Sequence, residues 1–316
     1  MEVRKLQLIG GSSFMVSLPK SWIKNNELGQ GDEVFLKVEN NIITIYPKKF
    51  FEISKIASVK INKLPRYDEK FLRRYIYALY IQGIDEITVE DENINARLIS
   101  KIGEIVKDLI GMEIIDASEG FIRLKCLAVT DFDVYSVVKR MTQIIKSMLQ
   151  TIKYLTLDPS SIRDIELLER DADRLYLLAV RQEHRLVREF SSPAKWNELR
   201  LILGIRTVAK LLEEIADSLY DFSNYLLKAM NPKEFINYLN DIENSFERVC
   251  EAYFNSQVDL AEDSIEILEE IEGKLIKVEG DPYFKLSVES LIIACRHMKS
   301  ICEIALNKAV RESIYK

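Results

Sequence analysis

The residues that could carry chemistry in this chain are two pairs of carboxylates. Glu169 and Asp173 lie four residues apart in "LERDADRL", and Glu213 and Asp217 have the same spacing in "LEEIADSL". This spacing puts both members of a pair on one helix face, where like charges repel unless a cation lies nearby. Two such helices packed together could offer four oxygen ligands to one metal ion. The sequence therefore predicts a metal site at these four residues.

A solvated charged face is the alternative. With 50 Asp and Glu in 316 residues, about eight such pairs are expected by chance, and carboxylates are mostly exposed. The flanking residues narrow the choice, because Glu213 and Asp217 lie at the border of an apolar stripe of Leu212, Ile215, Ala216 and Leu219.

Enzymatic use of these carboxylates is not expected. A di-iron bundle needs Glu-x-x-His on two helices, but His184 and His297 are preceded three residues earlier by Arg181 and Ala294. Both histidines are predicted to be helix-surface or partner residues. No nucleophile and base share a recognisable pattern, so we predict that the protein is not an enzyme.

Composition is typical of a soluble globular protein, with 47% apolar and 30% charged residues. No apolar run reaches the roughly 18 residues of a membrane span, and no export signal opens the chain. We therefore expect a cytoplasmic protein without membrane insertion. Four cysteines form no Cys-x-x-Cys pair and are expected to be reduced and buried: Cys126, Cys250, Cys295 and Cys302.

Three segments differ in pattern. Residues 1–50 alternate like short strands, with "GGSS" as the turn of a first hairpin and "SWIKNNELG" as a helical turn closed by Gly29. They hold seven Lys/Arg and five Asp/Glu, so their net charge is +2 while the whole chain carries −6. Four short strands cannot bury enough surface alone, and a partner chain would supply the rest.

Residues 51–130 predict an α+β module, with helices over 71–83 and 95–111, a strand in "IDEITVE" and a hairpin around Glu119-Gly120. From residue 131 to 316 the period changes to 3.6. Six helices are expected, at about 131–156, 160–190, 195–229, 233–256, 259–278 and 283–312. Prolines mark four of the helix starts, and two groups of three helices suggest a duplication.

Residues 1–48 resemble the swapped-hairpin domain of the AbrB/SpoVT/MazE group, through "VRKLQL", "MVSLPKSWI", "LGQGDEVFLKV" and "IITIYP". The resemblance implies that two chains interlace their hairpins into a homodimer whose basic face binds DNA. It places Arg4, Lys5 and Lys20 at DNA-contacting positions. Phe14 and Met15, however, stand near positions where relatives often have arginine, so a hairpin that only dimerises stays an alternative.

Residues 131–312 resemble the PhoU family, a duplicated three-helix bundle associated with regulation of phosphate uptake. The stretch "SPAKWNELRLILGIRTVAKLLEEIADSL" carries the resemblance, with Glu198-Leu199-Arg200 and Leu212–Asp217 as its signatures. The family's Glu/Asp-x-x-x-Asp metal motif implies ligands at Glu169, Asp173, Glu213 and Asp217. Residues near "LIGMEII" look like the linker of archaeal proteins that join these two modules.

The second repeat departs from this pattern. Lys299 stands where a carboxylate is expected, and Cys302-Glu303 replaces Gly-Asp. Glu272 matches one ligand position, with Leu268 at the other, and Lys299 could neutralise Glu272 and Glu303. We therefore expect one metal site, in the first repeat only. Ligand type favours calcium, magnesium or manganese, whereas the family resemblance suggests iron or zinc.

The expected fold is thus multi-domain: a small all-β swapped-hairpin domain, an α+β linker module and an all-α PhoU-like bundle of two three-helix repeats. The expected function is a dimeric, phosphate-responsive transcriptional regulator. The alternative is a PhoU-type protein that binds no DNA, docks on a phosphate transporter or sensor kinase, and dimerises through its N-terminal domain.

Overall fold

A computed structural model describes residues 2–39, 42–48, 58–127, 133–189, 196–230 and 235–314. The chain divides into two compact units: residues 1–56 with 191–194, and residues 57–190 with 195–316. The domain boundaries expected at 50/51 and 130/131 fall outside the described residues and stay predictions.

The first unit consists of two separate antiparallel hairpins and one short helix. The first hairpin pairs β1 (Gln7–Ile9) with β2 (Ser13–Met15), and the second pairs β3 (Val34–Glu39) with β4 (Ile42–Pro47). Gly10 and Gly11 have φ of +61° and +80° in the first turn, a backbone that glycine adopts without a steric penalty. Helix α1 (Lys20–Asn25) follows Pro19, as the sequence predicts.

The end of α1 differs from the expectation. The left-handed residue is Glu27, with φ of +54°, and not Gly29. The Leu28 amide donates to the Ile23 carbonyl (3.0 Å), and the Gly29 amide donates to the Asp32 carboxylate (2.7 Å). These hydrogen bonds close the turn, and Gly29 does not adopt the left-handed backbone conformation that would require glycine.

The first unit has almost no interior of its own. Of residues 2–38 and 42–48, only Pro47 is buried. Eleven large apolar side chains are exposed there: Val3, Leu6, Leu8, Ile9, Phe14, Met15, Val16, Phe35, Leu36, Val38 and Ile43. Isolated two-stranded hairpins are marginally stable in water, so these residues need a further surface against which to pack.

The α+β module forms a four-stranded sheet in the order β5-β6-β8-β7. Its elements are β5 (Ser58–Ile61), α3 (Glu69–Ile81), β6 (Glu86–Glu90), α4 (Ala96–Val106), β7 (Met112–Ser118) and β8 (Phe121–Cys126). β5 runs parallel to β6, and the other pairs are antiparallel. The hairpin at Glu119-Gly120 is confirmed, whereas β5 was not anticipated from its four residues.

Both helices of this module begin at side-chain caps. Asp68 accepts a hydrogen bond from the Phe71 amide (2.9 Å), and Asn95 accepts one from the Leu98 amide (3.0 Å). Such caps satisfy amides that the first helical turn leaves unpaired. Apolar residues of α3 and α4 then share one core with β6 and β8.

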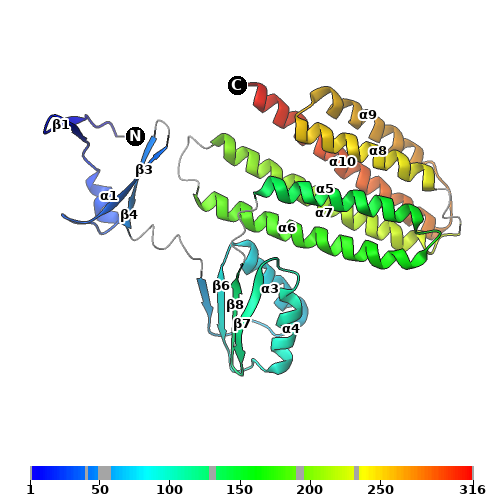
Figure 1. Cartoon of the computed structure of the whole chain (residues 1–316), viewed down its shortest axis with the longest axis horizontal. Helices are drawn as coiled ribbons and strands as arrows, with labels where there is room; N and C mark the ends of the chain where they lie inside the picture. The colour runs from blue at the N-terminus through cyan, green and yellow to red at the C-terminus, as the bar shows by residue number, and fades with distance from the viewer. Residues whose placement is uncertain are drawn as a thin grey trace. The chain divides into compact units, whose positions relative to one another are not determined.

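The third segment is an all-α bundle (Figure 1). It comprises α5 (Val134–Tyr154), the short η1 (Pro159–Ser161), α6 (Ile162–Glu189), α7 (Trp196–Leu226), α8 (Phe235–Asn255), α9 (Val258–Leu275) and α10 (Pro282–Ile314). Helices α5, α6 and α7 all contact one another, and so do α8, α9 and α10. The two groups meet mainly where α7 packs on α10. The expected two three-helix repeats are confirmed.

The connections explain the helix boundaries. Pro159 opens η1 ahead of α6, and Pro282 is the first residue of α10. The prolines expected to open the other helices, Pro193 and Pro232, lie outside the described residues. The α8–α9 break has no proline and is made by Ser256, whose φ is +54°.

Two arginines of α6 tie the bundle to the α+β module. Arg181 is 1% exposed and donates to the carbonyls of Tyr80 (2.8 Å) and Ile84 (2.9 Å) and to the Asp85 carboxylate (2.5 Å). Arg170 donates to the carboxylate of Asp108 at 2.8 and 2.5 Å. α6 therefore contacts the α+β module as well as α5 and α7.

Candidate metal site

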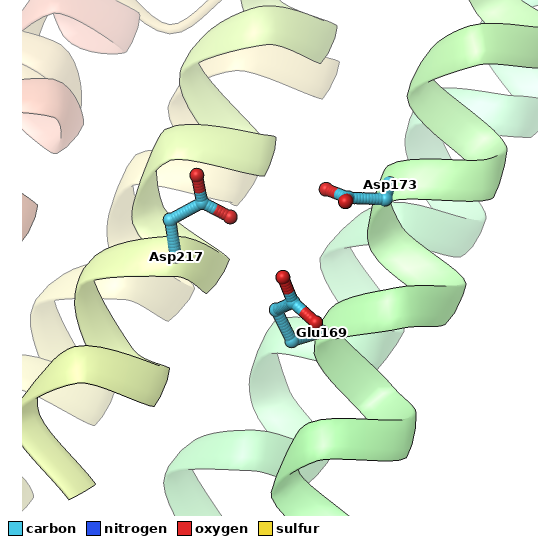
Figure 2. Close-up of side chains that lie close together, drawn as sticks. All are labelled: Glu169, Asp173 and Asp217. Atoms are coloured by element: carbon cyan, nitrogen blue, oxygen red, sulfur yellow. The ribbon is translucent and has the colours of Figure 1, made fainter. Parts of the chain in front are cut away.

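The predicted ligands come together between α6 and α7. Glu169 and Asp173 project from one face of α6, and Asp217 projects toward them from α7 (Figure 2). Oxygen atoms of these three side chains lie within 4.8 Å of one another. The apolar stripe of α7 places Asp217 there, because Leu212, Ile215, Ala216 and Leu219 are at most 1% exposed and orient the helix.

The fourth predicted ligand belongs to a second, overlapping group. Glu213, Glu214 and Asp217 also have oxygen atoms within 4.8 Å of one another. Asp217 is shared, so the five carboxylates form one continuous cluster with two triplets. We call Glu169, Asp173 and Asp217 the upper triplet, and Glu213, Glu214 and Asp217 the lower triplet. Glu214 was not anticipated, because it falls outside the four-residue spacing.

The upper triplet is partly buried and holds its protons tightly. Burial raises the pKa of Glu169 to about 7, with smaller contributions from Asp217 and Glu166. Burial, Glu169 and Glu213 raise the pKa of Asp173 to about 7. Burial, Glu213 and Asp173 do the same for Asp217. Such a site releases protons when a cation replaces them.

The lower triplet already has a cation. The Lys210 ammonium lies one helical turn before Glu213, donates to its carboxylate, and lies 2.6 Å from a carboxylate oxygen of Glu214. Burial raises the pKa of Glu213, and the hydrogen bond from Lys210 opposes that rise. Lys210 was not anticipated, although its i,i+3 and i,i+4 spacing to Glu213 and Glu214 is readable in the sequence.

Comparison with known protein families gives two matches. Residues 138–226 match the PhoU domain model. Residues 7–52 match the model described as antidote-toxin recognition MazE, bacterial antitoxin. The chain carries a MazE-type segment and a PhoU domain. The PhoU match runs from α5 to the end of α7 and includes all four predicted ligands. The comparisons with curated proteins and with solved structures give no match.

The second repeat, beyond the matched PhoU residues, is built differently. Lys299 of α10 lies 2.9 Å from the Glu272 carboxylate of α9, and Arg296 lies 2.6 Å from it. Lys299 also lies 3.8 Å from Glu269. The expected neutralisation of Glu272 is confirmed. Within the described residues Lys299 makes no ion pair with Glu303, so that part of the expectation is wrong.

The histidines and cysteines do not join the cluster. His184 and His297 are partly buried, and neither belongs to a potential ligand group in the described part of the chain. Burial lowers the pKa of His297; the nearby charge of Glu214 raises it, and that of Lys210 lowers it further. Cys250, Cys295 and Cys302 are buried free thiols, as expected, whereas Cys126 is partly exposed.

The predicted DNA-contacting residues lie on the MazE-type segment. Arg4, Lys5 and Lys20 are all exposed. Arg4 precedes β1 and forms an ion pair with Glu2, and Lys20 is the first residue of α1. Their role stays a prediction.

The donor set of the upper triplet fits a hard cation. Carboxylate oxygens from two helices suit calcium, magnesium or manganese, and no histidine or thiolate is present to favour a softer metal. Glu169, Asp173 and Asp217 would hold such an ion, and its charge would remove their mutual repulsion.

No helix in the described residues combines the length and apolarity needed to cross a bilayer.

Proposed function

We propose that this protein is a dimeric, phosphate-responsive regulator that acts in the cytoplasm without catalysing a reaction. The presence of a MazE-type segment and a PhoU domain on one chain carries the proposal. The MazE-type segment dimerises and binds DNA. The PhoU domain responds to phosphate status, through a metal ion in the upper triplet or through a partner protein.

Dimerisation is supported by the exposed apolar residues of the first unit. Leu8, Phe14, Leu36 and Val38 are 59–70% exposed on two hairpins that share no sheet. Such side chains on a folded protein mark an interaction surface. A second copy of the same hairpins offers apolar area of the same kind, as the resemblance to interlaced hairpins implies.

DNA binding is tested by a salt titration. Each lysine or arginine that contacts a phosphate releases counterions, so removing one contact lowers the slope of log affinity against log salt by about one. We expect the Arg4→Ala/Lys5→Ala/Lys20→Ala variant to lose affinity evenly across genomic fragments and to show a shallower slope. The matched control is Lys24→Ala, which removes an exposed cation from the same unit.

A second candidate function is favoured by the ion pair between Arg4 and Glu2, which withdraws one cation from the DNA-binding set. In this alternative the first unit only dimerises, and the PhoU domain docks on a phosphate transporter or sensor kinase. An unchanged salt slope in the triple variant, or no DNA binding by the wild type, would favour it.

A further inference from the structure

The carboxylate cluster has unequal halves. Lys210 makes ion pairs with two of the three lower-triplet residues, Glu213 and Glu214. Within the described residues, no ion pair is formed by Glu169 or Asp173, and Asp217 has none either. Five carboxylates therefore share one cation, which lies entirely at one end of the cluster.

The position of Lys210 is fixed by more than its charge. Its ammonium lies 5.3 Å from the centre of the Tyr176 ring, which belongs to α6. A cation over an aromatic face is attracted by the ring. The Lys210 ammonium thus contacts Glu213 and Glu214 of its own helix and the Tyr176 ring of α6. This second contact holds the ammonium over the lower triplet.

The second repeat also pairs a carboxylate with basic residues of the chain itself. There Arg296 and Lys299 of α10 reach a carboxylate of the neighbouring α9, whereas Lys210 pairs with carboxylates of its own helix. Arg296 and Lys299 together hold the single carboxylate of Glu272. Glu272 therefore has two basic partners, whereas in the first repeat one lysine pairs with two carboxylates.

We propose that Lys210 is an internal counter-ion for Glu213 and Glu214. It thereby restricts the cluster to one divalent cation, held by Glu169, Asp173 and Asp217. A second divalent ion on Glu213 and Glu214 would have to displace the ammonium from both carboxylates. This inference rests on the metal site of the proposed function.

The test is the number of ions bound by the full-length chain. Equilibrium dialysis against Mn²⁺ with metal analysis should give one ion for the wild type and two for Lys210→Gln. Lys210→Arg keeps the charge and should stay at one. Lys210→Gln/Glu214→Gln removes a lower-triplet ligand and should return to one. Arg296→Gln removes a basic partner of Glu272 in the second repeat and should leave the count unchanged.

Other outcomes distinguish the counter-ion role of Lys210 from the existence of the metal site. Two ions in the wild type, or one in both the wild type and Lys210→Gln, would overturn the counter-ion role and leave the metal site standing. No ion in any variant would overturn both. Thermal unfolding of each variant without metal checks that it is folded, and Lys210 is exposed enough that its loss should not prevent folding.

Discussion

At the scale of single residues, the three carboxylates of the upper triplet repel one another when ionised, and protons or a cation relieve this repulsion. Glu169, Asp173 and Asp217 have pKa values near 7 in the folded chain, whereas unfolded carboxyls titrate near 4. Between those pH values the folded state holds protons that the unfolded chain has lost. Folding stability contributed by these groups is therefore greatest at low pH and falls as pH rises through 7.

This linkage predicts how pH and metal act together. Without divalent ions, raising the pH from 5 to 8 should lower the free energy of unfolding of the bundle by about 1–3 kcal/mol, a range that allows for partial solvent exposure and coupling. Asp173→Asn/Asp217→Asn should remove most of this change. Added Mn²⁺ should restore stability at pH 8 by mass action in the wild type only.

Urea unfolding with and without EDTA measures both effects. Asp171→Asn/Asp221→Asn is the matched control, because it removes two exposed carboxylates from the same two helices. If the wild type gains nothing from Mn²⁺ and the amide variant shows the same pH profile, the carboxylates form a solvated face.

At the scale of elements, Asp108 joins three helices. It follows α4 and accepts hydrogen bonds from Arg73 (2.5 Å) and Tyr77 (2.8 Å) of α3 and from Arg170 of α6. Its side chain is 8% exposed. Burial would raise its pKa, but these donors lower it. Arg170 also directly follows Glu169, so the contact helps to set the position of the upper triplet.

Replacing Asp108 with Asn should loosen the packing of α3 on α6. We expect a loss of about 1–2 kcal/mol in the free energy of unfolding, because the arginines are partly exposed and regain water. Hydrogen exchange should speed up in α3 and the middle of α6. Asp171→Asn breaks the exposed 3.2 Å ion pair with Arg174 and should cost at most a few tenths of a kcal/mol. Equal effects of the two changes would argue against a docking role for Asp108.

At the scale of the whole molecule, oligomerisation should depend on the first unit. Deleting residues 1–48 should convert a dimer into a monomer that keeps its helical content, since the bundle and the α+β module have buried cores of their own. Light scattering and circular dichroism measure these two properties. A truncated chain that remains dimeric would move the interface to the helical bundle or the α+β module.

The sequence by itself determined the local features of this protein. The 3.6-residue period located the bundle helices, because an apolar stripe must follow the helix repeat to be buried. The four-residue spacing placed Glu169 with Asp173, and Glu213 with Asp217, on shared faces. The glycine turn and the alternating runs located both hairpins of the first unit.

Only the tertiary structure decided which faces meet. Its packing brought Asp217 of α7 beside Glu169 and Asp173 of α6 to form the upper triplet, because this depends on the rotation of α7 against α6. It also buried Arg181, although arginine is a residue type that is mostly exposed, by bringing the carbonyls of Tyr80 and Ile84 within hydrogen-bond distance of it. β5 was missed for the same reason: four residues carry little signal, and pairing with a strand 28 residues away is what makes them a strand.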